Sequence, residues 1–180
     1  MRRAALRIAC ILAVIGTGGC ASGDLEAPTR PGPVATVSPV VTTATPSASE
    51  YVGRAGSLDL FVLRSSELAL QRASSAKVRD VARSTISIHQ GTSAQLAFAS
   101  RRLGIAVSPV LQPSEQEMLD QLQRSMEFDR TYAAQQKLVY RRALELHHAY
   151  AAGGTSPTLK PVASFVVTRL RDHQRVIDSL

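Results

Sequence analysis

Apolar residues recur every three or four positions from Glu50 to the C-terminus, which is the spacing of one face of a helix. The spacing predicts four long helices, over about 50–74, 75–102, 126–152 and 157–180. No alternating strand pattern occurs among them. The first helix with the second, and the third with the fourth, would form two hairpins that close into a bundle. The pattern therefore predicts an all-α, antiparallel four-helix bundle over residues 50–180.

Helix start and stop signals agree with this division. Ser47 or Ser49 can cap the first helix, and Gly104 can end the second. Ser114, with Glu117 three residues later, predicts a capping box for a short extra helix over 115–124, in the connector between helices two and three. Proline after serine at 156–157 predicts the start of the last helix. The expected buried positions are Tyr51, Ala55, Leu58, Val62, Ala69, Ala73, Val78, Val81, Ala82, Thr85, Thr92, Leu96, Ala99, Leu103, Phe128, Tyr132, Gln135, Val139, Ala143, Leu146, Tyr150, Leu159, Val162, Val166, Leu170, Ile177 and Leu180.

The first 49 residues follow a different pattern. Residues 1–20 have a basic start, a short apolar run and small residues before Cys20, which is typical of a signal peptide. Residues 21–49 are rich in Pro and Thr and show no helical period, so they are expected to be a disordered tether.

Cys20 has two interpretations. With the preceding Thr-Gly-Gly it resembles the lipobox of bacterial lipoproteins, in which cleavage leaves the cysteine first and its thiol carries a diacylglycerol. Ala21 after it resembles the sorting signal for the outer membrane. The alternative is ordinary cleavage nearby, with Cys20 incidental or removed. Lipid attachment would anchor the protein at the periplasmic side of the cell envelope, at the outer membrane.

Composition narrows the range of partners. Aromatic residues make up 4% of the chain and tryptophan is absent, which argues against a base-stacking surface. The net charge is +7, and from residue 50 onward 17 basic and 12 acidic residues leave +5. Both signs are interspersed along the helices, so nucleic-acid binding is not expected. The alternative is a solvated basic surface that faces anionic envelope components.

The candidate chemistry lies with the histidines. His89 and His173 occupy positions where core leucines would be expected, so both could face the interior and bind a divalent metal. The alternative is that each is a core histidine bonded to a Tyr, a Gln or a backbone carbonyl. No Asp or Glu occupies a predicted buried position. Glu145 and His148 have Glu-x-x-His spacing but share a face with arginines, which indicates a solvated surface, and His147 next to His148 forms no same-face pair. No catalytic constellation is present in the sequence, and no cofactor is expected.

Several segments carry a family resemblance: Ser-Ser-Glu-Leu-Ala-Leu-Gln-Arg-Ala-Ser at 65–74, Val78-Arg79, His89, Phe-Asp-Arg-Thr-Tyr at 128–132, Gln136 and His173. Together they resemble a family of uncharacterised exported bacterial proteins, a domain of unknown function described as a predicted outer membrane protein. The resemblance covers about residues 51–180 and implies a ferritin-like four-helix bundle.

The resemblance also implies a metal hypothesis for the family, with inward histidines and a carboxylate. Two of its histidines match His89 and His173, while Val62 stands at the helix-one glutamate and Tyr140 at the helix-three histidine. Tyr132, Gln136 and Tyr140 are expected near the two histidines. We therefore expect a non-enzymatic envelope lipoprotein with a structural, stress-related or interaction role. The alternative is a metal-binding or redox ferritin-like protein that uses His89 and His173.

Overall fold

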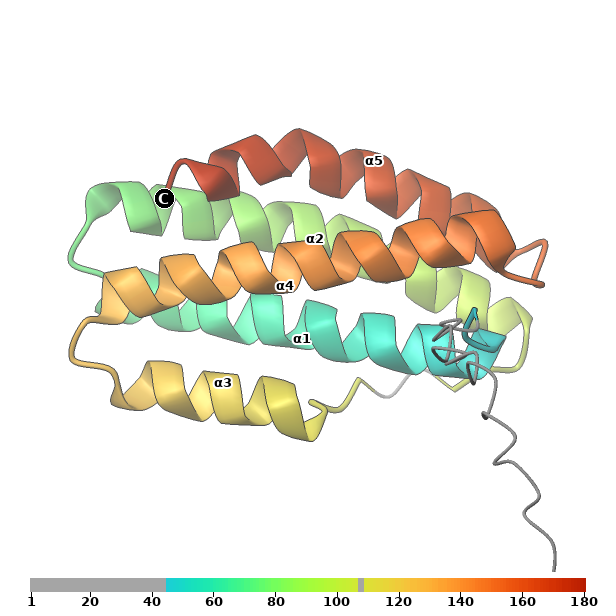
Figure 1. Ribbon diagram of the computed structural model, residues 1–180, viewed down its shortest axis with the longest axis horizontal. Coiled ribbons are helices and arrows are strands. Elements are labelled where there is room, and N and C mark those ends of the chain that lie inside the picture. Colours follow the sequence, from blue (N-terminus) through green and yellow to red (C-terminus); the bar gives the residue numbers. More distant parts are fainter. Residues whose placement is uncertain (1–44, 107–108) are drawn as a thin grey trace, which may run out of the picture. The chain divides into compact units, whose positions relative to one another are not determined.

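The computed structural model describes residues 45–106 and 109–180, so the predicted signal peptide, Cys20 and most of the predicted tether lie outside the described residues. The described chain contains helices and no strand. None of these helices is both long and apolar enough to cross a bilayer. The five helices, shown in Figure 1, are α1 (Ala48–Arg72), α2 (Ala76–Arg102), α3 (Pro113–Arg124), α4 (Phe128–Gly153) and α5 (Leu159–Asp178).

The four long helices pack side by side as a bundle. Helix α1 contacts α2 and α4, and α5 contacts the same two helices from the other side. Each of these neighbouring pairs runs antiparallel (Figure 1). The short helix α3 lies outside this group and packs on α1 and α4. The prediction of an all-helical domain built from two hairpins is confirmed at this level.

The helix ends confirm some sequence signals and correct others. Ser47 caps α1 in a complete capping box with Glu50, and Gly104, at φ 68°, follows the end of α2. The predicted capping box of Ser114 with Glu117 is wrong. Pro113 takes the first turn of α3, and the Ser114 hydroxyl instead donates to Glu115 at 3.0 Å.

The last helix begins slightly later than predicted. Helix α5 starts at Leu159, and the Ser156 hydroxyl accepts the Leu159 N–H at 3.3 Å while residues 157 and 158 form a turn. Most expected core positions are buried. Leu103 is the clear exception, with 39% of its surface exposed, because it lies just beyond the end of α2 where the chain turns away.

Two charged side chains organise the turns at one end of the bundle. The Asp129 carboxylate, at the start of α4, accepts from the N–H groups of Ser74 and Ser75 at 3.2 and 2.8 Å and from the Ser74 hydroxyl at 2.6 Å. The Arg72 guanidinium, at the end of α1, donates to the carbonyls of Leu122 and Ser125 near the end of α3. Each turn is therefore fixed by a residue from the other half of the chain.

Glu115 joins α3 to the bundle. It is 5% exposed, accepts from the Ser57 hydroxyl of α1 at 3.1 Å and forms an ion pair with Arg142 of α4 at 3.6 Å. The Ser57 hydroxyl in turn accepts the Gln112 N–H at 2.7 Å. A buried carboxylate was not expected from the sequence. It is tolerated because each of its oxygens has a donor.

Candidate functional site

The two histidines singled out by the sequence meet at one tyrosine. His89 of α2 and His173 of α5 are both buried, and so is Tyr140 of α4. The Tyr140 hydroxyl lies 3.0 Å from Nε2 of His89 and 2.9 Å from Nδ1 of His173. The phenol therefore bridges two imidazoles that come from different helices.

The bridge continues at both ends. Nδ1 of His89 contacts Oδ1 of Asp59, which comes from α1. Nε2 of His173 lies 3.0 Å from the Ser84 hydroxyl, and this hydroxyl lies 2.8 Å from the backbone carbonyl of Val81 in the same helix. We call the series Asp59, His89, Tyr140, His173 and Ser84 the polar chain. It links all four long helices, and each of its four ring nitrogens has a partner.

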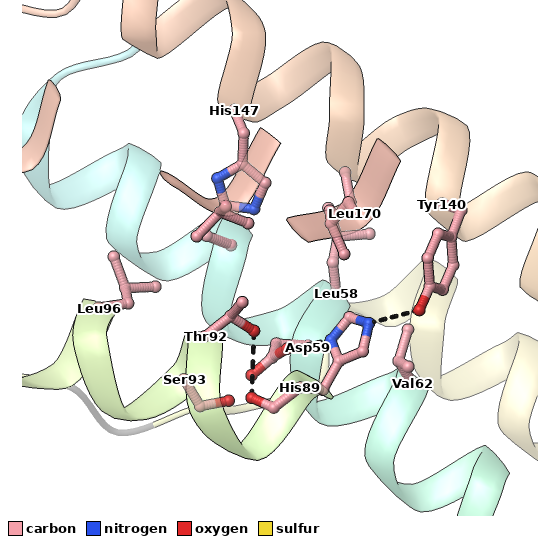
Figure 2. A pocket seen from close by; sticks show the side chains of 13 residues that line it. Leu58, Asp59, Val62, His89, Thr92, Ser93, Leu96, Tyr140, His147 and Leu170 are labelled. Atoms are coloured by element: carbon pink, nitrogen blue, oxygen red, sulfur yellow. Dashed lines mark hydrogen bonds and ion pairs between the residues drawn. The ribbon is translucent and has the colours of Figure 1, made fainter. Parts of the chain in front are cut away.

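The sequence pattern placed no Asp or Glu at a buried position, but the structure brings the Asp59 carboxylate to His89. Its side chain is 18% exposed, so it lies at the edge of the buried stripe of α1, and it approaches the His89 ring from the side opposite Tyr140 (Figure 2). It stands one helical turn before Val62. Val62, which the resemblance places at a helix-one glutamate, therefore has a carboxylate three residues before it on the same face of α1.

The other two expected neighbours lie elsewhere. The Tyr132 hydroxyl pairs with that of Ser66 at 3.0 Å, and the Gln136 amide donates to Ser65 at 2.8 Å. Both are buried contacts between α1 and α4. Of the three expected neighbours, Tyr140 alone hydrogen-bonds to His89 and His173.

A third buried histidine was missed by the sequence analysis. His147 is 6% exposed, and its Nδ1 lies 2.9 Å from the hydroxyl of Tyr51, whose ring stacks on Tyr150 at 3.9 Å between centroids. The neighbouring His148 is exposed, and so is Glu145. Helical spacing contained the signal, because His147 follows buried Ala143 by four residues and precedes Tyr150 by three.

Burial shifts the pKa values of two histidines and of the tyrosine in this region. Desolvation, and then the nearby charge of His89, lower the pKa of His173 to about 4 and that of His147 to about 3. Desolvation also raises the pKa of the Tyr140 phenol. At neutral pH, His147 and His173 are therefore neutral and Tyr140 keeps its proton.

A small cavity adjoins the polar chain. Asp59, His89, Tyr140 and His147 line it together with apolar side chains, and Figure 2 shows their arrangement. It leaves about 20 Å³ for the centre of a water molecule, which is room for about one water. In the part of the chain that the structure describes, no three His, Cys, Asp or Glu side chains are grouped as ligands of a metal ion. The ring nitrogens are instead used in hydrogen bonds.

Comparison with known proteins identifies a family but names no activity. No curated protein and no solved structure matches the chain. A family model described as a domain of unknown function, DUF4142, matches residues 35–180. This match includes every described helix and begins inside the segment predicted to be a tether. The chain belongs to the DUF4142 family.

Proposed function

We propose that the protein is an exported, lipid-anchored component of the cell envelope, and that its helical domain has a structural, stress-related or interaction role without catalysis. In this proposal Cys20 carries the lipid, residues 21–49 form the tether and the helices form the unit displayed on the periplasmic side of the outer membrane. The basic surface of the domain would face anionic envelope components.

The observation that carries the non-catalytic part is the closure of the polar chain. Its imidazoles and phenol bond to one another and to Asp59 and Ser84, and Tyr140 is 1% exposed. The adjoining cavity has room for about one water, which is too little for an organic substrate. Such a cluster joins four helices, and its directional hydrogen bonds favour one packing of the bundle over others.

The anchor is tested by metabolic labelling with an alkyne fatty acid in a bacterial host. We expect label on the wild-type protein and on Cys10→Ser, because Cys10 leaves with the signal peptide, and no label on Cys20→Ser. The thiol at position 20 is the proposed attachment atom, so its loss removes the lipid. Absence of label from the wild type, or its persistence in Cys20→Ser, would contradict the anchor.

Metal binding or redox chemistry through His89 and His173 is the competing proposal. It is favoured by Asp59, which adds a carboxylate beside His89, and it is opposed by the hydrogen bonds that occupy all four ring nitrogens. Elemental analysis of the purified full-length protein, and its melting temperature with and without chelator, distinguish the two proposals. We expect substoichiometric metal and an unchanged melting temperature. One metal per chain, with a lower melting temperature in chelator, would establish the competing role, because a ligand that binds the folded state stabilises it.

We further propose that the bundle has a ferritin-like arrangement. The support is its topology, in which the connector and α3 run back along the bundle between α2 and α4 (Figure 1). This return lets α4 run in the same direction as α2. A single long crossover of this kind is the feature that distinguishes ferritin-like bundles from those joined by short loops throughout.

A further inference from the structure

The polar chain has more hydrogen bonds than protons. Counted from Asp59 to the Val81 carbonyl, it contains five contacts: Asp59 to His89, His89 to Tyr140, Tyr140 to His173, His173 to Ser84, and Ser84 to the carbonyl. Each contact needs one proton. With an ionised Asp59 and neutral histidines, the two rings, the phenol and the Ser84 hydroxyl supply one proton each, which makes four. The observed geometry therefore accommodates one additional proton.

The position of Ser84 shows which contact depends on that proton. An ionised Asp59 can only accept, so four protons that fill the four contacts between Asp59 and Ser84 must all point toward Asp59. Ser84 would donate to His173, His173 to Tyr140, Tyr140 to His89 and His89 to the carboxylate. The Ser84 hydroxyl would then have no proton for the Val81 carbonyl. Yet its oxygen lies 2.8 Å from that carbonyl and 3.0 Å from the His173 ring. Back-bonding of a helical serine to a preceding carbonyl is a common local hydrogen bond.

With five protons, the direction of the chain reverses beyond His89. Ser84 donates to Val81 and accepts from Nε2–H of His173, and Nδ1 of His173 accepts from Tyr140. Tyr140 accepts from Nε2–H of His89, and the fifth proton lies between Nδ1 of His89 and the Asp59 carboxylate. All five contacts are then satisfied.

We propose that Asp59 and His89 form a buried proton-binding site, and that the proton held there sets the direction of every hydrogen bond from His89 to Ser84. The ligand of this site is a single proton, shared as an imidazolium–carboxylate pair. This inference goes beyond the proposed envelope role and does not depend on it.

The surroundings of His89 suit a positive charge at that position. From α4 it is faced by Tyr140 and His147, and from α5 by His173, all of which are neutral at neutral pH because burial lowers the histidine pKa values and raises that of the phenol. From α1 it is faced by the Asp59 carboxylate. A buried ion pair is tolerated when the remaining polar atoms are also bonded, as they are here.

Protons have a route to the site. The Asp59 side chain is 18% exposed, and it lines both the internal cavity and a groove between α1 and α2 at the surface. The carboxylate therefore lies between solvent and the ring that it contacts. Exchange does not require α1 and α2 to separate.

The test is ¹⁵N NMR of the full-length protein with labelled histidines at pH 7. Chemical shifts of the ring nitrogens distinguish a doubly protonated ring from each neutral tautomer. We expect both nitrogens of His89 to be protonated and His173 to carry its single proton on Nε2. A single proton on the His89 ring, or a His173 proton on Nδ1, would overturn the proposal.

Ser84→Ala tests whether the two ends of the chain are coupled. Without the hydroxyl, three contacts remain, and three protons on His89, Tyr140 and His173 satisfy them. We therefore expect His89 to lose its second proton, His173 to change to the Nδ1–H tautomer, and the proton affinity of the site to fall at least tenfold.

Two variants serve as controls for this change. Ser84→Thr keeps the hydroxyl and should keep the wild-type spectrum, and Ser87→Ala replaces an exposed serine on the same helix and should also leave it unchanged. A Ser84→Ala spectrum identical to the wild type would show that the protonation of His89 does not depend on chain direction, and would overturn the proposal. The wild-type spectrum decides the question even if a variant does not fold.

Discussion

Replacing Tyr140 with phenylalanine is expected to lower the free energy of unfolding by about 2–5 kcal/mol, as measured by urea denaturation. The phenol bonds to a nitrogen of His89 and to one of His173, and both nitrogens are buried. Its loss leaves two ring nitrogens unpaired, and each unpaired buried polar group costs about 1–3 kcal/mol. The aromatic ring itself is retained, so little of the effect should come from lost packing.

Tyr150 provides a matched control. It is also a buried tyrosine of α4, but its hydroxyl has no hydrogen-bond partner among the described residues. Tyr150→Phe should therefore change the free energy of unfolding by less than about 1 kcal/mol, or increase it, because removing an unpaired buried hydroxyl removes a desolvation cost. Equal losses from Tyr140→Phe and Tyr150→Phe would argue against the polar chain as a stabilising element.

Acidification is expected to destabilise the protein between pH 6.5 and 4. Histidines of the unfolded chain bind protons near pH 6.5, whereas burial lowers the pKa of His173 to about 4 and that of His147 to about 3. The unfolded state therefore takes up protons first. The stability is complete above pH 6.5 and is lost as the pH falls toward the two folded-state values. Together the two histidines should account for a loss of about 3–7 kcal/mol in the free energy of unfolding, since one pKa unit corresponds to about 1.4 kcal/mol.

Denaturation curves recorded at several pH values measure this slope. His147→Gln should reduce the slope by about half, because it removes one of the two buried neutral imidazoles. The glutamine side chain can still accept a hydrogen bond from the Tyr51 hydroxyl. His148→Gln changes the exposed neighbour and should leave the slope unaltered. An unchanged slope in His147→Gln would contradict the assignment of a buried neutral ring.

The helices were predictable because local sequence determines where they begin and end. Ser47 with Glu50, Ser75 and Gly104 act through backbone groups within a few residues of themselves, so their effect is visible in the sequence. The predicted start of α3 was wrong, because Pro113 and Ser114 are competing signals for the start of a helix. Pro113 took the first helical turn and left Ser114 inside the helix, where its hydroxyl could no longer cap.

The site was less predictable because it depends on the relative positions of the helices. His89 and His173 could be placed on buried faces from spacing, but their common partner Tyr140 lies on a third helix whose register the sequence does not specify. Asp59 did leave a signal: it follows Ala55 by four residues and precedes Val62 by three, so it lies on the face that those residues bury. Leu58, one residue earlier, fitted the apolar spacing, so Asp59 was not counted among the expected buried positions.

Asp129 and Arg72 each bond to a turn in the other half of the chain, and this has a consequence for how the domain folds. The first turn of α2 depends on Asp129, which follows it by more than fifty residues, and the end of α3 depends on Arg72, which precedes it by a similar distance. A fragment containing α1 and α2 would lack the carboxylate, and one beginning at α3 would lack the guanidinium. Neither half alone can therefore form the hydrogen bonds that fix its own helix ends. The domain should behave as a single cooperative folding unit, in which both halves are lost together.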